Sequence, residues 1–150
     1  LGAAPAVERL LLRAFVPGRY AKAAERQREG NAPIPELSFV AWQDGQIVGC
    51  VRQYAVSIGG SPAILLGPFA VDPDARSQGL GAALIVQARD AAADAGHDLI
   101  VLVGDLPYFG PLGFVRAGAA VAMPGPVDQR RVLVCALKAG ADKGLVGAVV

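Results

Sequence analysis

The sequence predicts a single mixed α/β domain, and three observations support that fold class. Apolar stretches of strand length fill residues 37–71 and are separated by short turns. An amphipathic helical stretch at residues 80–95 follows, and it leads into residues 99–103, which are apolar throughout. A strand that is apolar on both faces is typical of a sheet covered on both sides. The order therefore indicates antiparallel strands first and then a strand–helix–strand unit, which is a mixed α/β order.

Each element follows from local spacing and from the residues that interrupt it. Asp44-Gly45 is a dipeptide typical of hairpin turns, and Gly96 ends the long helix. The elements predicted in chain order are helices at residues 5–15 and 19–29, strands at 37–43, 47–58 and 64–71, a helix at 80–95, a strand at 99–103, a short helix at 107–112, and strands at 115–123 and 131–138. The Gly- and Ala-rich tail after residue 140 carries little signal.

Composition narrows the class of protein. The chain has 150 residues, 53% hydrophobic and 18% charged, which favours one compact domain over residues 1–150. The net charge is +1 and the basic residues are scattered outside residues 9–28, which argues against nucleic acid as a partner. No apolar run approaches the ~18 residues of a membrane span. Cys50 and Cys135 lie in apolar runs, which predicts buried free thiols and a cytoplasmic location.

One stretch combines a strand, a polar turn and a helix start. The strand at 64–71 is closed by Asp72-Pro73, residues 72–78 form a polar turn, and helical spacing begins at Gly79 or Leu80. A helix N-terminus has unpaired N–H groups and a partial positive charge, which suit a phosphate. Gly79 and Gly81 bring no side chains that would keep a ligand from the backbone. The sequence therefore predicts an anion-binding loop here.

The segment Arg76-Ser77-Gln78-Gly79-Leu80-Gly81 fits the pattern Arg/Gln-x-x-Gly-x-Gly/Ala behind a strand. It resembles the acyl-CoA signature of the GCN5-related N-acetyltransferases, the GNAT family. The resemblance implies a mixed central sheet of the acyl-CoA N-acyltransferase type, flanked by helices, in which the parallel strands at 64–71 and 99–103 splay apart. The family's usual first strand is then short or missing in this chain. The cofactor-binding residues that the resemblance implies are Phe69, Ala70 and Val71 along the pantetheine arm, and Arg76, Ser77, Gln78, Gly79, Leu80, Gly81 and Ala82 around the pyrophosphate.

A second block matches further along the chain. This block has Phe109, three further residues and then Gly113-Phe114, and it resembles the second coenzyme A segment of the family. The wider block, residues 99–114, resembles the YhbS-like subgroup of the family. The resemblance implies that Phe109 also contacts the coenzyme. The family usually has tyrosine at this position, where it protonates the departing thiolate. Phenylalanine cannot do so, and the neighbouring Tyr108 is the candidate catalytic acid.

The resemblance implies acetyl-CoA as co-substrate, no metal, and direct attack by an amine on the thioester. The acceptor is then a small-molecule or peptide amine, and the protein is a monomer or a homodimer. The general base stays open between Glu36, Asp105 and a relay through water. An alternative from another class is a non-catalytic acyl-CoA-binding sensor or partner module on the same fold, which the missing tyrosine favours.

Other interpretations are weaker. In a dinucleotide-binding domain, Asp105 at the end of the next strand would bind a ribose. That motif needs a third glycine where this chain has Leu84, and a tight turn after the strand where this chain has a long one. The single histidine, His97, is predicted to be a surface or cap residue, and no His/Cys cluster indicates a metal. Phe39 and Trp42 are predicted to lie in the core.

Overall fold

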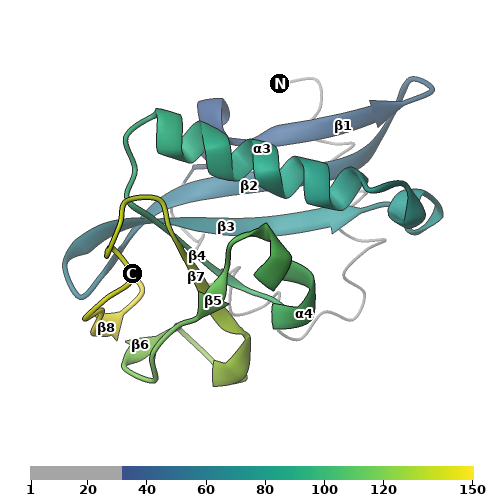
Figure 1. Ribbon diagram of the computed structural model, residues 1–150. Coiled ribbons are helices and arrows are strands. Elements are labelled where there is room, and N and C mark those ends of the chain that lie inside the picture. Colours follow the sequence, from purple (N-terminus) through teal and green to yellow (C-terminus); the bar gives the residue numbers. More distant parts are fainter. Residues whose placement is uncertain (1–31) are drawn as a thin grey trace.

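The computed structural model describes residues 32–150 apart from the side chains of residues 76–78. The helices predicted at residues 5–15 and 19–29, and the prediction of a short or missing first strand, lie outside the described residues. Within them, three strands, a long helix, a strand and a short helix follow one another in the predicted order. The fold is the mixed α/β sheet of the prediction (Figure 1). The fold class is therefore confirmed.

The main sheet has six strands in the order β1-β2-β3-β4-β7-β5. Their bounds are β1 Phe39–Gln43, β2 Gln46–Ile58, β3 Ser61–Val71, β4 Leu99–Val103, β7 Val132–Ala136 and β5 Val115–Arg116. β3 and β4 are parallel, and the other neighbours are antiparallel. The connection between the parallel pair is the long helix α3 (Leu80–Asp94), as a parallel pair requires.

The parallel strands separate part-way along their length. Their register holds only Ile64 with Ile100 and Leu65 with Val101, although β3 continues to Val71. Past this point β3 stays paired with β2, and a bulge there leaves Gly67 and Pro68 opposite a single residue of β2. We call the separation between residues 66–71 of β3 and residues 102–103 of β4 the strand opening. The splayed pair expected from the family resemblance is thus present.

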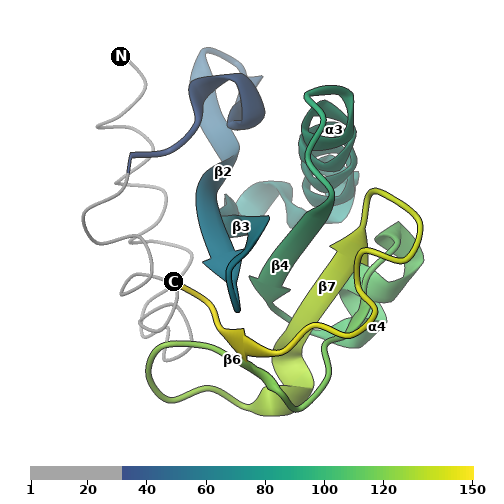
Figure 2. The same cartoon turned by 90° about the vertical axis from the view of Figure 1, so that its left-hand side faces the viewer.

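The sheet is covered on both faces, and alternation along the strands assigns each side chain to one face. Ile64, Ile100 and Leu133 join the core cluster under α3, to which the helix contributes Leu84, Ile85, Ala88 and Ala92. Leu65, Val101 and Val134 belong to the cluster on the opposite face. Figure 2 shows α3 and the short helix α4 (Leu106–Phe109) on the same side of the sheet.

In the C-terminal third one prediction is wrong, and one strand was not predicted. The strand expected at residues 115–123 is divided into β5 and a separate strand, β6 (Val121–Ala122), because Gly118 and the alanines around it carry little strand propensity. The tail forms β8 (Gly147–Ala148), which pairs with β6 in a second sheet. Val149 is fully buried in the cluster opposite α3, so the tail closes that face of the core.

The prediction for the two aromatic residues of β1 is only half right. Phe39 is partly buried and packs against the cluster under α3. Trp42 is 60% exposed, so its assignment to the core is wrong. Trp42 stands one residue before the end of a strand that has a single neighbour, β2, among the described residues. Few side chains surround such a position, and burial does not follow from its hydrophobicity.

Gln53 is a fully buried polar side chain that ties three elements together. Its amide nitrogen donates to the carbonyl oxygen of Leu37 at 2.8 Å and to that of Ala88 in α3 at 3.0 Å. Leu37 ends the short 3₁₀ helix η1 (Pro35–Leu37), so Gln53 joins η1, β2 and α3. Within the described part of the chain, its own side-chain oxygen has no hydrogen-bond partner.

We expect Gln53→Met to lower the free energy of unfolding by about 1–3 kcal/mol, because two buried carbonyl groups lose their donor. Urea denaturation measures the change. Gln87→Met, at an exposed position on α3, is the matched control and should change stability by less than about 0.5 kcal/mol. Equal effects of the two substitutions would show that the bridge contributes nothing.

Both cysteines are free and buried, as predicted. Burial raises the pKa of the Cys135 thiol, and Asp142 adds to that effect, while nearby Arg89 opposes it. A raised pKa leaves less thiolate at neutral pH, and thiolate is the reactive form. We therefore expect a disulfide reagent at pH 7 to label the native protein much more slowly than the protein in denaturant, where both thiols react. Fast labelling of the native protein would contradict this.

Candidate active site

The backbone of β3 presents polar groups toward the strand opening. The N–H of Asp72 donates to the carbonyl oxygen of Val48 in β2 at 2.7 Å. In an antiparallel ladder, successive residues direct their N–H and C=O groups to opposite edges. The register pairs Ala70 with Cys50 and Phe69 with Val51, so the backbone groups of Phe69 are directed away from β2, toward β4. This edge can accept an extended ligand as if it were a further strand.

The polar turn after β3 is the 3₁₀ helix η2 (Pro73–Gln78), and α3 begins directly after it. The carboxylate of Asp72 accepts a hydrogen bond from the N–H of Asp74 at 3.0 Å and so caps η2. Gly79 caps α3 with φ 74°, a conformation that other residues rarely adopt. Gly79 has no side chain that could cap α3, and the first turn of the helix has no acidic residue. Its N–H groups and partial positive charge are therefore suited to an anion.

Gly81 has a different reason to be glycine. A Cβ atom there would lie 2.5 Å from the hydroxyl oxygen of Tyr108, 3.1 Å from Cζ of Phe69 and 3.3 Å from a methyl group of Val71. Three predicted site residues from two elements thus meet at the first turn of α3. Of the predicted loop residues, Leu80 and Ala82 are partly buried beside Gly81, and nothing is described for the side chains of residues 76–78.

Aromatic side chains connect the two sides of the strand opening. The ring of Phe69 on β3 lies 6.2 Å from that of Tyr108 and 6.1 Å from that of Phe109, between ring centres. Phe109 packs edge to face on Phe114 and against Gly104, which directly follows β4 and has no Cβ in the way. Gly104 has no assigned role in the sequence analysis. The aromatic residue five positions later is the signal for its packing role.

Tyr108 and Phe109 differ in their surroundings. Phe109 is 7% exposed and belongs to the core under α3, whereas Tyr108 is 44% exposed. Partial burial raises the pKa of the Tyr108 phenol above its ordinary value of about 10, so the phenol keeps its proton at neutral pH. Tyr108 therefore carries a proton at neutral pH, while its role as the acid and the contact of Phe109 with a coenzyme both stay predictions.

The candidate bases are not gathered at this place. Asp105 lies at the start of α4, and its Oδ1 forms an ion pair with Nε of Arg131 at 3.0 Å. Glu36 is an exposed residue of η1. His97 follows the C-terminus of α3, and its N–H donates to Ala92, so it is a cap residue about 22 Å along the helix from Gly81.

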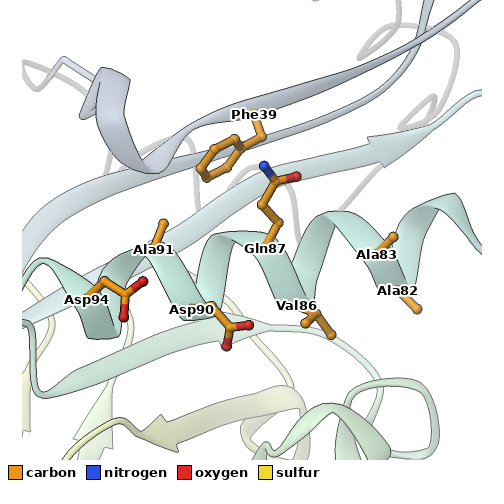
Figure 3. A pocket seen from close by; sticks show the side chains of 8 residues that line it. All are labelled: Phe39, Ala82, Ala83, Val86, Gln87, Asp90, Ala91 and Asp94. Atoms are coloured by element: carbon orange, nitrogen blue, oxygen red, sulfur yellow. The ribbon is translucent and has the colours of Figure 1, made fainter.

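A groove of about 680 Å³ runs along α3 on the side of β1 (Figure 3). Phe39 of β1 lies over Gln87 and Ala91, and the other lining residues are Ala82, Ala83, Val86, Asp90 and Asp94. Its carboxylates would repel phosphate groups, so it is not a second coenzyme site. Among residues 32–150, no group of three or more acidic, histidine or cysteine residues could hold a metal ion. No helix in the same range is long and apolar enough to cross a membrane.

Comparisons with known proteins agree with this geometry. The family model described as "Acetyltransferase (GNAT) domain" matches residues 35–116. A structure of the GNAT family N-acetyltransferase YhbS from Escherichia coli in complex with CoA is 28% identical, with a TM-score of 0.83 over 99% of this chain and 84% of that one. A GNAT family acetyltransferase from Brucella melitensis in complex with acetyl-CoA is 27% identical, with a TM-score of 0.72 over 99% and 88% of the two chains.

A third structure shares the fold at lower identity. The ribosomal-protein-S18-alanine N-acetyltransferase from Escherichia coli is 23% identical, with a TM-score of 0.61 over 94% of this chain and 91% of that one. No curated protein matches the chain. The family model covers more than half of the sequence, and its range includes β3, the glycine loop, α3 and α4. The chain therefore belongs to the family of GNAT acetyltransferase domains.

Proposed function

We propose that the protein transfers the acetyl group of acetyl-CoA to an amine, by direct attack within a ternary complex. The observation that carries the proposal is the strand opening beside the N-terminus of α3, whose cap residue is a glycine. Phe69, Gly81 and Tyr108 are in contact there. Both similar structures with the higher identities are complexes with CoA or acetyl-CoA. The acceptor is a small-molecule or peptide amine.

Each part of acetyl-CoA has a complementary part of this site. The edge of β3 at Phe69, Ala70 and Val71 accepts the pantetheine arm, because an amide-containing chain can pair with an open strand edge. The loop from Arg76 to Ala82 receives the pyrophosphate, because the first N–H groups of α3 and its dipole favour negative charge. The thioester then lies between β3 and β4.

The chemistry forms one bond and breaks one. The amine nitrogen attacks the thioester carbonyl carbon, the C–S bond breaks, and the sulfur leaves. A backbone N–H of β3 near Phe69 stabilises the oxyanion that forms in between. Tyr108 donates its proton to the sulfur as the C–S bond breaks, and the thiol that forms has a pKa near 8.5. The acceptor ammonium loses one proton to water or Glu36 before the attack, because only the neutral amine has a lone pair. After the attack the nitrogen gives up a second proton through water, and this proton restores the Tyr108 phenol. The ion pair with Arg131 makes Asp105 a better anchor for α4 than a base.

The binding module without turnover is favoured by one observation, the phenylalanine at position 109. Tyr108 counts against it, because a partly exposed phenol stands at the strand opening. Release of free thiol from acetyl-CoA in the presence of primary amines, such as a polyamine, a lysine peptide and an aminoglycoside, separates the two functions. We further expect the protein to be cytoplasmic, since free cysteines and acetyl-CoA both fit a reducing compartment. We expect it to be a monomer or a homodimer.

Replacement of Gly81 by valine tests the coenzyme site. Its side chain would occupy the space between Tyr108 and Phe69, so we expect the Kd for CoA to rise at least about tenfold, or 1.4 kcal/mol. Isothermal titration calorimetry measures the affinity. Gly118→Val, where an added Cβ meets nothing within 4 Å, is the control and should bind CoA normally. Unchanged affinity in Gly81→Val would refute the assignment.

Tyr108→Phe tests the acid. We expect kcat to fall by about 10²-fold with an unchanged Kd for acetyl-CoA, because one general acid is lost and thiolate is a fair leaving group. The raised pKa of Tyr108 predicts that wild-type kcat declines only above pH 10, as the phenol loses its proton. The reciprocal variant Phe109→Tyr shows whether the family's usual position supports faster turnover. Full kcat in the Tyr108→Phe variant would show that Tyr108 is not the general acid.

A further inference from the structure

The segment that carries Tyr108 and Phe109 is too short to hold its own shape. It consists of α4 and the 3₁₀ helix η3 (Gly110–Leu112), each a single turn, and Pro111 near the start of η3 lacks a backbone N–H. Helices of this length are not stable by themselves in water. Contacts from neighbouring elements must therefore decide where this segment, which we call the α4–η3 segment, places Tyr108.

Arg89 of α3 provides such a contact. Its Nη1 donates to the carbonyl oxygen of Leu112 at 2.7 Å. Leu112 ends η3, where carbonyl groups lack partners within the helix, and a guanidinium donor makes a stronger bond than a neutral one. Gly113 then turns the chain with φ 103°, and a Cβ there would lie 3.6 Å from Nη1 of Arg89. The guanidinium thus lies against the turn that ends the segment.

Asp90 orients the same guanidinium. Its Oδ1 accepts from Nε of Arg89 at 3.2 Å and lies 3.2 Å from Nη2. These contacts use one side of the planar fork and leave Nη1 directed at Leu112. The Arg89 side chain is 28% exposed, whereas that of Arg130, which pairs with Asp128, is 76% exposed. Arg89 therefore has a defined position.

α3 contacts the α4–η3 segment at two levels. In its first turn, Gly81 lies against the hydroxyl of Tyr108. Eight residues further along α3, about 12 Å along the helix axis, Arg89 donates a hydrogen bond to Leu112. The start of the segment is anchored separately, by the ion pair of Asp105 with Arg131 and by the N–H of Gly104, which donates to Arg131. The helix that offers its N-terminus to the coenzyme is thus the same helix that holds the end of the tyrosine segment.

We propose that Arg89 is a positioning residue, which sets Tyr108 at the strand opening by fixing the end of the α4–η3 segment to α3. This inference rests on the proposed function, because Tyr108 is there the acid for the leaving thiolate. Arg89 acts through its hydrogen bond to Leu112. Its loss affects turnover and leaves the pyrophosphate loop at the other end of α3 intact.

The experiment is a double-mutant cycle of Arg89→Ala with Tyr108→Phe. In the wild-type background we expect Arg89→Ala to lower kcat about tenfold with an unchanged KM for acetyl-CoA. In the Tyr108→Phe background the same change should have an effect of less than twofold, because the residue that it positions is already disabled. Arg89→Lys, which keeps a cationic donor, should recover part of kcat.

An optical titration tests the positioning without any turnover. Each protein is titrated to alkaline pH beside its own Tyr108→Phe variant, and the ultraviolet absorbance of both is recorded. The difference between the two absorbance curves reports the pKa of Tyr108. We expect that pKa to be lower in the Arg89→Ala pair than in the wild-type pair, because a released segment exposes the phenol. Arg130→Ala, which removes the ion pair with Asp128 instead, is the control and should change neither kcat nor the titration.

The outcomes separate this inference from the proposed function. If wild-type protein transfers no acetyl group to any amine, the proposed function fails, and the optical titration still tests Arg89. If Arg89→Ala lowers kcat equally in both backgrounds, or leaves the Tyr108 titration unchanged, Arg89 does not position Tyr108. Partial rescue by lysine together with a near-zero effect in Tyr108→Phe supports the role.

Discussion

The rest of the structure depends on the interruption of pairing between β3 and β4. Two register pairs join these strands, and after Leu65 the edge of β3 has no partner in β4. An unpaired strand edge inside a protein is costly unless something satisfies its polar groups. The bulge at Gly67 and Pro68 bends and twists β3 just past its last pair with β4. The opening is thus built into the backbone and needs no movement of the sheet.

Two other elements converge on this opening because of their connections. α3 must cross from the end of β3 to the start of β4, so its N-terminus lies beside the open edge of β3. The α4–η3 segment follows β4 directly, so its aromatic residues lie at the other side. Phe69, Tyr108 and Phe109 meet where these two connections meet. Helix dipole, open strand edge and a phenol are therefore brought together by chain topology, although they come from residues almost 40 positions apart.

Burial explains how a phenylalanine at position 109 and a tyrosine at position 108 belong together. Phe109 contacts Phe114 and Gly104 within the core, where a hydroxyl group would need a buried partner. Tyr108 is the more exposed of the two rings, and its hydroxyl lies against Gly81. A polar aromatic is tolerated there because its oxygen can reach water or a ligand. The difference in exposure explains a packing role for Phe109 and is compatible with the acid role proposed for Tyr108.

The sequence by itself determined the strands, the long helix, the glycine loop and the fold class, since these depend on local spacing and on interrupting residues. It also indicated Phe69, Gly81 and Tyr108 as site residues through a motif. It could not place Trp42, the divided strand around Gly118 or the tail, because edge position and distant partners decide those. The contacts of Arg89 with Leu112 and of Gly81 with Tyr108 arise only on folding. Tertiary structure alone decides which side chains from α3 and α4 meet, because local periodicity defines the face of a helix but not what packs against it.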